Sequence, residues 1–444
     1  MRTIDLRGAR GLRPGELAAA LPRAALDVDA AANQVRPLLE AVARQGAAAI
    51  ADQAARFDKV VPPSVRVPPE LISQALAGLS PEVRAAMEVS IERVRRVHAA
   101  QVPPDGTVEV APGGFVSQRW IPVRRVGMYA PGGLVVYPSS VIMNVVPAQV
   151  AGVAELAVAS PPQRDHGGYP HPTILAACAL LGVKEVYAAG GASAIGLFAY
   201  GLPELDPPAE PVDVITGPGN VYVAAAKRLV MGRVGIDAEA GPTEIAIIAD
   251  QSANPEFVAT DLVSQAEHDP LAAVVLITDA PDLSQAAAAA TARRARATRH
   301  AERVSQALSG PQSAIVLVDD LDQAIQVANA YAPEHLELQV SDAAQVAERI
   351  TSAGAIFVGS YSPVPLGDYL AGSNHVLPTG GTARFASGLG VTAFLKSVQQ
   401  IEYSAAALAQ VAPLITAFAQ AEDLPAHGVG RSPSGAGEFA PPGG

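Results

Sequence analysis

Between residues 126 and 231 the chain alternates short apolar runs with segments of helix length, and this alternation constrains the fold more than any other feature. Each of the runs VGMY, ELAVAS, EVYAAG and VDVITG is followed by a stretch long enough to form a helix. This repetition predicts βαβ units, because parallel strands need a crossover between them. Several runs end in glycine just before a helix, an arrangement in which open parallel sheets bind nucleotides.

The same alternation resumes from residue 244 with the runs EIAIIAD, AAVVLIT, AIVLV, LELQV and AIFVG, which predicts a second α/β unit. Apolar residues recur at helical spacing over 25–100, whereas 114–126 is typical of strand and turn. Beyond residue 380 we expect two helices, at 394–408 and 412–422. A Gly, Pro and Ser-rich end follows, and its last dozen residues are expected to be disordered.

Length and charge limit the class of protein. A chain of 444 residues allows two to four domains. The net charge of -12 and the scattered basic residues argue against nucleic acid and anionic membranes as partners. The N-terminus lacks the apolar region of a signal peptide, and no apolar run reaches the roughly 18 residues that span a bilayer. We therefore expect a cytoplasmic protein with no membrane segment.

Cys178 is the only cysteine, and it lies in an apolar run of helical character. A single cysteine excludes internal disulfides and thiolate-rich metal sites, and a buried structural role is expected for it. Any metal must therefore be held by nitrogen and oxygen ligands.

The segment NPEFVATDLVSQAEH, residues 254–268, is predicted to be a helix that brings Gln265 and His268 onto one face near its C-terminal end. Taken alone, the two could equally be polar residues on a solvated face. Further candidate ligands stand in two other stretches, GDYLAGSNHVLPT with Asp368 and His375, and AEDLPAH with Glu422 and His427. A site of Gln265, His268, Asp368 and His427 would suit zinc or a similar divalent ion.

Glu334 and His335 stand side by side in YAPEHLELQV, between a helix that Pro333 ends and a predicted strand. A glutamate whose pKa is raised by partial burial and a histidine near neutrality are common general acid and base groups. An arbitrary Glu-His pair is more often an exposed turn. Glycine clusters at 131–133, 190–191 and 217–219 follow predicted strands without forming GxGxxG, so their shared position is what indicates a dinucleotide site.

Taken together, these segments resemble the histidinol dehydrogenase family over about residues 57–427. The matching segments, in the family's order, are VGMYAPGG, GGASAIG, ITGPGNVYVAAAKR, DAEAGPTEIAIIAD, SQAEH, YAPEHLELQ, GDYLAGSNHVLPT and AEDLPAH. The resemblance implies a zinc enzyme that uses NAD to oxidise L-histidinol to L-histidine by four electrons, through an enzyme-held histidinaldehyde. These are the last steps of histidine biosynthesis.

The resemblance also implies an α/β fold of two incomplete Rossmann-like domains with a small C-terminal helical tail. We expect an N-terminal arm at 1–24, a first domain at 25–125 and 241–379, a second domain at 126–240, and a dimerisation tail at 380–444. The implied assembly is a homodimer in which the tail of each subunit completes the active site of its partner.

Site residues follow from the resemblance position by position. It implies one zinc per active site on Gln265, His268, Asp368 and the partner subunit's His427, with His335 as the base for the alcohol and Glu334 as the group that activates water. Further substrate contacts fall on Thr243, His375 and Glu422. Cofactor contacts fall on Tyr129, Ser193 and Asn220, although the family usually has a longer glutamine at the position of Ser193.

Two other functions fit parts of the sequence. One alternative is a related zinc and NAD dehydrogenase that acts on another polar alcohol, such as a sulfonated diol. Glu422 argues against it, because a carboxylate favours a cationic substrate over an anionic sulfonate. A non-catalytic nucleotide-binding module would have no physical need for Glu334, His335 and a complete set of metal ligands.

Overall fold

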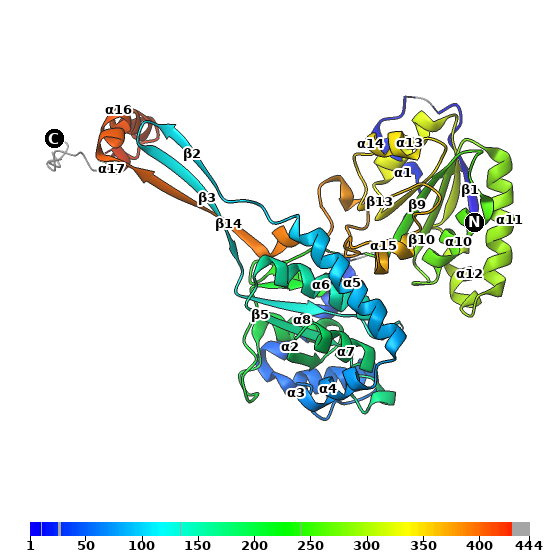
Figure 1. Cartoon of the computed structure of the whole chain (residues 1–444), viewed down its shortest axis with the longest axis horizontal. Helices are drawn as coiled ribbons and strands as arrows, with labels where there is room; N and C mark the ends of the chain where they lie inside the picture. Colours follow the sequence, from blue (N-terminus) through cyan, green and yellow to red (C-terminus); the bar gives the residue numbers. More distant parts are fainter. Residues whose placement is uncertain (10, 25–27, 134, 240, 429–444) are drawn as a thin grey trace. The chain divides into compact units, whose positions relative to one another are not determined.

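The computed structural model describes residues 1–9, 11–24, 28–133, 135–239 and 241–428. The chain forms two units: unit 1 is Met1–Gln101 with Val123–Phe394, and unit 2 is Val102–Pro122 with Leu395–Gly444. Unit 1 contains two parallel sheets and unit 2 contains one antiparallel sheet (Figure 1). The disorder expected for the last dozen residues concerns a part of the chain outside the described residues.

The first parallel sheet of unit 1 has five strands in the order β6-β5-β4-β7-β8. Its strands are β4 (Arg125–Tyr129), β5 (Glu155–Ser160), β6 (Glu185–Ala188), β7 (Val214–Thr216) and β8 (Gly235–Ile236). The connecting helices are α6 (Pro138–Ala151), α7 (Pro172–Leu180), α8 (Gly191–Tyr200) and α9 (Val221–Val230). When these five strands are numbered 1 to 5 in chain order, their order in the sheet is 3-2-1-4-5, as in a Rossmann fold. The predicted βαβ units are therefore confirmed, and Cys178 is buried in α7 as expected.

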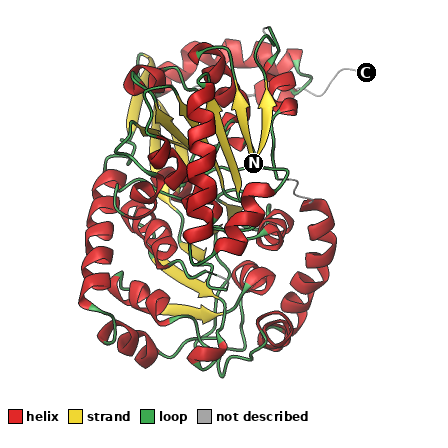
Figure 2. Ribbon diagram, turned by 90° about the vertical axis from the view of Figure 1, so that its right-hand side faces the viewer, coloured by secondary structure: helices red, strands yellow, loops and turns green. Residues whose placement is uncertain are grey.

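The second parallel sheet has six strands in the order β1-β11-β10-β9-β12-β13. They are β1 (Arg2–Asp5), β9 (Glu244–Ala249), β10 (Ala273–Thr278), β11 (Ala314–Leu317), β12 (His335–Gln339) and β13 (Ala355–Val358). Helices cover both faces of this sheet (Figure 2). They are α1 (Pro14–Ala20), α10 (Pro255–Ala266), α11 (Pro281–Ala297), α12 (Ala301–Ser309), α13 (Leu321–Tyr331), α14 (Ala343–Glu348) and α15 (Val364–Tyr369). None of the helices described is long and apolar enough to cross a membrane.

The N-terminal helices pack against a different sheet from the one expected. These helices are α2 (Val28–Gln45), α3 (Ala47–Gln53), α4 (Pro69–Ala77) and α5 (Pro81–Ala99). They share hydrophobic cores with the five-stranded sheet, whereas the prediction grouped them with the six-stranded one. Conversely, β1 of the expected N-terminal arm pairs with β11 in the six-stranded sheet. Helical periodicity shows that a helix has a buried face, but it does not show which sheet covers that face.

Unit 2 has an antiparallel sheet in the order β14-β3-β2 followed by helices. Its elements are β2 (Gly106–Ala111), β3 (Gly114–Pro122), β14 (Leu395–Tyr403), α16 (Ala405–Ala421) and α17 (Pro425–Gly428). The strand predicted near 114–126 is confirmed, but the helix predicted at 394–408 is wrong over β14. That segment pairs with β3 from Leu395 opposite Pro122 to Tyr403 opposite Gly114. A partner so distant in sequence leaves no local signal.

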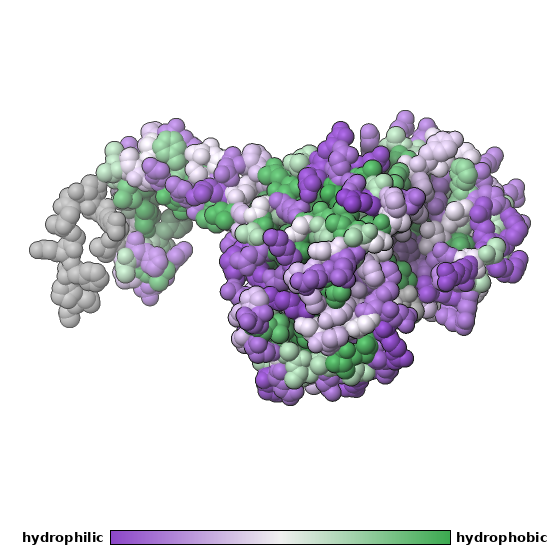
Figure 3. Space-filling view, turned by 60° about the horizontal axis from the view of Figure 1, so that its bottom comes forward, coloured by the Kyte–Doolittle hydropathy of each residue, from purple (hydrophilic) through white to green (hydrophobic). Residues whose placement is uncertain are grey.

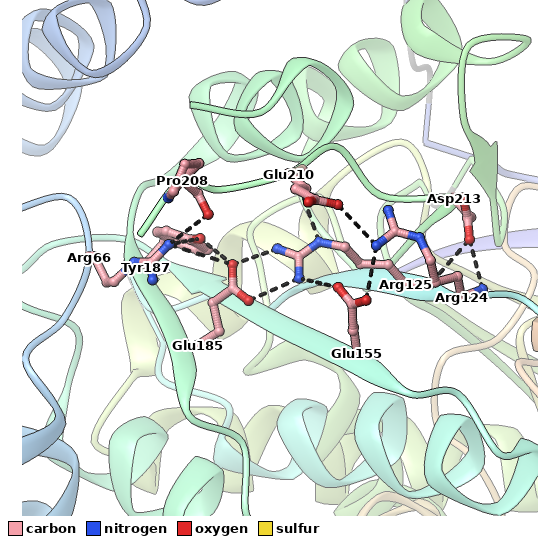
Figure 4. Close-up of polar contacts among 9 residues, drawn as sticks. All are labelled: Arg66, Arg124, Arg125, Glu155, Glu185, Tyr187, Pro208, Glu210 and Asp213. Carbon is pink, nitrogen blue, oxygen red and sulfur yellow. Dashed lines mark hydrogen bonds and ion pairs between the residues drawn. The ribbon is translucent and has the colours of Figure 1, made fainter. Parts of the chain in front are cut away.

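The amino edge of the five-stranded sheet is closed by a network of charged side chains (Figure 4). Arg125 is 4% exposed, and it donates to Glu155 at 3.1 Å and to Glu185 at 2.9 Å. Tyr187 donates to the same Glu185, and Arg66 donates to the Tyr187 hydroxyl at 3.0 Å. With its charges paired, this edge is held together by its own side chains, and the carboxyl edge is the one left for a ligand.

Candidate active site

A cavity of about 1020 Å³ in unit 1 lies where the carboxyl edge of the five-stranded sheet meets the amino edge of the six-stranded sheet. Small-molecule sites in proteins usually enclose roughly 300–1,000 Å³, so this cavity has room for a cofactor and a substrate together. Eight residues singled out from the sequence line it: Tyr129, Asn220, Thr243, His268, Glu334, His335, Asp368 and His375.

On the six-stranded sheet, two candidate site residues lie at the amino-terminal ends of strands. Thr243 immediately precedes β9, and Glu334 immediately precedes β12, the neighbouring parallel strand. Because His335 is in register with Ile245, Glu334 lies beside the start of β9. Glu334 precedes a strand, as its segment predicted. Asp368 and His375 both follow β13, with Asp368 in helix α15.

A chain of hydrogen bonds fixes the orientation of Glu334. The Gln265 amide nitrogen donates to the Thr243 hydroxyl at 2.6 Å, and that hydroxyl donates to Oε2 of Glu334 at 2.6 Å. The backbone N–H of Glu244 donates to the same oxygen at 2.9 Å. The chain leaves Oε1 of Glu334 available to a ligand in the cavity. It also turns Oε1 of Gln265 away from Thr243, and that buried oxygen has no hydrogen-bond partner among the described residues.

The surroundings of Glu334 suit proton transfer near neutral pH. The side chain is buried, and burial raises the pKa of its carboxyl to about 7. The Thr243 and Glu244 hydrogen bonds act in the opposite direction, and the charge of Asp368 raises the pKa further. A carboxyl with a pKa close to the working pH is an efficient general acid or base.

Backbone carbonyls fix the tautomers of His335 and His268. Nδ1 of His335 lies 3.2 Å from the carbonyl oxygen of Glu244, and Nδ1 of His268 lies 3.2 Å from that of Ser264. A carbonyl oxygen only accepts, so each Nδ1 carries the proton and each Nε2 presents a lone pair. Burial lowers the pKa of His335, which keeps its ring neutral. His335 can therefore accept a proton, and His268 can bind a metal through Nε2.

His375, which also lines the cavity, is held in the same way. Its Nδ1 donates to the carbonyl oxygen of Asp368 at 3.1 Å, which leaves Nε2 to accept from the Ser140 hydroxyl at 3.3 Å. Burial lowers the pKa of His375. A neutral ring tied to both Asp368 and Ser140 is suited to positioning a ligand rather than to carrying charge.

Unit 1 supplies three of the four expected zinc ligands. The orphaned Oε1 of Gln265, Nε2 of His268 and the carboxylate of Asp368 are oxygen and nitrogen donors of the kind that zinc accepts. Within the described parts of the chain, no three His, Cys, Asp or Glu side chains come together as a metal site. Glu422 and His427 belong to unit 2, where both side chains are exposed.

The five-stranded sheet presents Tyr129 and Asn220 to the cavity. The hydroxyl of Tyr129, at the end of β4, accepts a hydrogen bond from the N–H of Gly191 at 3.2 Å. The side-chain oxygen of Asn220 accepts from the N–H of Tyr222 at 3.0 Å and caps α9, which leaves its amide nitrogen for a ligand. The N-termini of α8 and α9 therefore open on the carboxyl edge, where backbone N–H groups favour phosphate.

The loop that carries Asn220 is braced by a buried ion pair. Gly217 has φ +117°, and a Cβ there would lie 2.1 Å from the carbonyl oxygen of Tyr129, so this position requires glycine. Lys227, which is 1% exposed, donates to the Gly217 carbonyl at 3.0 Å and pairs with Asp237. Asp237 in turn accepts from the Gly217 N–H at 2.8 Å.

Ser193 does not line the cavity, unlike the other two expected cofactor contacts. Its side chain is buried, and its hydroxyl donates to the carbonyl oxygen of Gly190 at 2.8 Å, within the first turn of α8. A side chain as short as serine is satisfied locally there. The lining residues that were not singled out from the sequence include Asp58, Tyr137 and Ser140. Tyr137 and Ser140 follow the glycines after β4, a position that points to a site, whereas Asp58 lies in no recognisable motif.

A Rossmann-type sheet beside a cavity lined by candidate acid, base and metal-binding groups is typical of a dinucleotide-dependent oxidoreductase. The sequence model described as histidinol dehydrogenase matches residues 21–431. The histidinol dehydrogenase of Nocardia farcinica is 60% identical over 426 residues, which are 96% of each chain. That of Thermobifida fusca is 59% identical over 96% of this chain and 95% of the relative. The crystal structure of histidinol dehydrogenase from Elizabethkingia anophelis matches with a TM-score of 0.88 and 34% identity, over 96% of each chain.

The chain therefore belongs to the histidinol dehydrogenase family, and it is an NAD-dependent oxidoreductase. The α/β fold class inferred from the sequence is confirmed by the structure and by its likeness to the crystal structure. These relatives give no support to a sulfonated diol as the substrate.

Proposed function

We propose that this protein oxidises L-histidinol to L-histidine with two molecules of NAD, through histidinaldehyde, in the cytoplasm, as the last steps of histidine biosynthesis. One observation carries the proposal: the base Nε2 of His335 and the free Oε1 of Glu334 belong to adjacent residues lining one cavity with His268 and Asp368. The names of the relatives support the choice of substrate.

His335 serves the alcohol step. Its neutral ring, fixed by the Glu244 carbonyl, takes the hydroxyl proton of histidinol on Nε2 as the carbinol carbon loses a hydride. When bound, NAD accepts the hydride from each of the two oxidations. We place it on the five-stranded sheet, with Tyr129 and Asn220 as contacts. Ser193 no longer belongs to this set, because its hydroxyl is bonded to Gly190.

Glu334 serves the aldehyde step. Oε2 is anchored by Thr243 and the Glu244 N–H, so Oε1 is left to take a proton from the water that attacks the aldehyde carbon. The resulting hydrate then loses its hydride to give the carboxylate. Enclosure in the cavity holds the reactive aldehyde between the two steps.

We propose that Gln265, His268, Asp368 and the partner subunit's His427 hold one zinc ion per active site. The orphaned oxygen of Gln265 supports this assignment, because a buried amide oxygen without a partner is costly unless a ligand occupies it. Bound zinc would act as a template for the imidazole and amino group of histidinol. We assign the remaining substrate contacts to Thr243, His375 and Glu422.

We propose a homodimer because the described residues of unit 2 form no apolar core of their own. The only buried apolar residues described in unit 2 are Ala407 and Ala419. Large apolar side chains gather instead on its surface (Figure 3), including Ile401 at 70%, Leu414 at 64% and Phe418 at 72% exposure. Exposed apolar patches of this kind mark protein interfaces. A second copy would cover the patch and bring the exposed Glu422 and His427 to its partner.

Purified protein tests the proposal through two measurements. We expect NADH formation with L-histidinol, none with a sulfonated diol, and close to one zinc per chain after gentle purification. The His268→Ala variant should lose most of the zinc, whereas His300→Ala, which replaces a histidine at the N-cap of α12, should keep it. Turnover of the diol in place of histidinol would reject the substrate, and a full zinc content in His268→Ala would reject the ligand set.

A further inference from the structure

Asp58 lies at the end of the cavity formed by the five-stranded sheet, and nothing in the proposed reaction uses it. It is the last residue of the short π-helix η1 (Ala54–Asp58), which follows α3, and it lines the cavity with Tyr129 and Gly190. A Cβ on Gly190 would lie 3.2 Å from Oδ2 of Asp58 and 3.2 Å from Cβ of Pro161. The carboxylate therefore sits against the turn after β6 and beside the residue that follows β5.

This location has a defined role in Rossmann folds. In the strand order 3-2-1-4-5, the ribose of the adenosine lies at the end of the second strand, where an acidic side chain accepts hydrogen bonds from the ribose hydroxyls. The second strand here is β5, which is followed by Pro161, Pro162 and Gln163 rather than by an acid. The next acid along the chain, Asp165, is exposed and does not line the cavity. Asp58 reaches this place from outside the βαβ units.

The electrostatic setting favours a neutral hydroxyl donor over a phosphate. Burial raises the pKa of Asp58 to about 6, so at neutral pH the group is mainly an anion. No hydrogen bond or ion pair joins its carboxylate to another described side chain. Arg56 in the same turn also lines the cavity, but its guanidinium lies 4.9 Å from the centre of the Phe57 ring and forms no ion pair with Asp58. An anionic acceptor without a salt-bridge partner attracts hydroxyl groups and repels a phosphate placed against it.

We propose that Asp58 is the residue that selects NAD over NADP, accepting hydrogen bonds from the adenosine ribose hydroxyls and repelling a 2′-phosphate. The inference rests on the proposed function only in placing the dinucleotide in this cavity. It assigns the adenosine to the end near Gly190 and the nicotinamide to the end near His335.

Fluorescence titration of NADH and NADPH, without histidinol, tests the role of Asp58 by binding rather than by turnover. The wild-type protein should bind NADH more tightly than NADPH. Asp58→Asn should weaken NADH binding by about tenfold, the loss expected for a charge-assisted hydrogen bond, and should leave NADPH binding unchanged or tighter. Asp52→Asn, which removes an exposed carboxylate of α3, is the matched control and should alter neither affinity. Equal midpoints of thermal unfolding would show that both variants fold.

The outcomes separate this inference from the proposed function. If wild-type protein binds NADH, and Asp58→Asn weakens NADH and NADPH equally or changes neither, the selective role of Asp58 is rejected while the proposed function stands. Equal affinity of the wild-type protein for the two dinucleotides would reject the role as well. If Asn220→Ala and Tyr129→Phe also leave NADH binding unchanged, the dinucleotide does not occupy this cavity, and the proposed function has to be revised with it.

Discussion

Glu334 and His335 are adjacent at the start of β12, but different hydrogen-bond partners hold their side chains. The carboxylate of Glu334 is held by Thr243 and a backbone N–H, whereas the ring of His335 is held by the Glu244 carbonyl. The sequence was enough to name the pair as an acid and a base. It could not show which oxygen of Glu334 or which nitrogen of His335 stays free, because that depends on Thr243 and Glu244, which are distant in sequence.

The two roles predict separable effects of substitution. His335→Asn should slow the alcohol step by ~10²–10⁴-fold, because the amide side chain cannot accept the hydroxyl proton. Glu334→Gln should slow aldehyde oxidation more than alcohol oxidation, because the amide cannot take a proton from water. Stopped-flow traces started from histidinol and from histidinaldehyde measure the two steps separately. Equal losses in both steps for either variant would contradict the assignment.

The pH dependence of the two steps should differ as well. Because burial raises the pKa of Glu334 to about 7, aldehyde oxidation should fall as the pH drops through about 7 and the base becomes protonated. Burial lowers the pKa of His335, so alcohol oxidation should fall only at more acidic pH. Rate profiles for each step, with Glu334→Gln as the control that lacks the limb near pH 7, provide the measurement. Coincident profiles in the wild-type protein would exclude this division.

Sequence patterns predicted the helices and strands that carry their own periodicity, and they missed the features that depend on contacts distant in sequence. The βαβ units of the five-stranded sheet were predictable because each apolar run and each helix carries its own periodicity. The strand β14 was not, because its partner β3 lies far away in the sequence. Ser193 was placed in the cofactor site only by the resemblance to the family. The structure shows its hydroxyl donating to the carbonyl oxygen of Gly190 at the start of α8. Asp58, by contrast, was not expected at the cavity but lines it, because η1 carries it there from outside the βαβ units.

The buried pair of Lys227 and Asp237 should stabilise the loop that carries Asn220. Lys227→Met would leave Asp237 buried without its partner and the Gly217 carbonyl without its donor, at a cost of about 3–5 kcal/mol in the free energy of unfolding. Urea unfolding measures the loss, and NADH binding should weaken with it. Arg84→Met, which removes the exposed partner of Glu88 on α5, should cost no more than about 0.5 kcal/mol. Similar losses in the two variants would exclude a special role for the buried pair.

At the scale of the whole molecule, the proposed zinc ligands are divided between the two units. Unit 1 carries Gln265, His268 and Asp368, and unit 2 carries the exposed His427 and a surface rich in apolar side chains. Residue chemistry was enough to group the four positions as candidate ligands, and the resemblance to a family then implied their roles at one zinc ion. Spacing alone could not assign residues from different units to one site.

A site shared between subunits predicts complementation. His427→Ala and Glu334→Gln homodimers should each be nearly inactive, but after unfolding and refolding as an equal mixture they should regain about a quarter of wild-type activity. Random pairing makes half of the dimers hybrids, and each hybrid contains one native site. Refolding each variant by itself is the control and should restore nothing. If the mixture stays as inactive as its components, each site is built from one chain.

If both oxidations take place in one cavity, the ratio of NADH formed to histidinol consumed should show it. With histidinol limiting and NAD in excess, we expect two NADH and one histidine for each histidinol, with no free aldehyde detected by a carbonyl trap. One NADH for each histidinol, with histidinaldehyde accumulating in the trap, would contradict it.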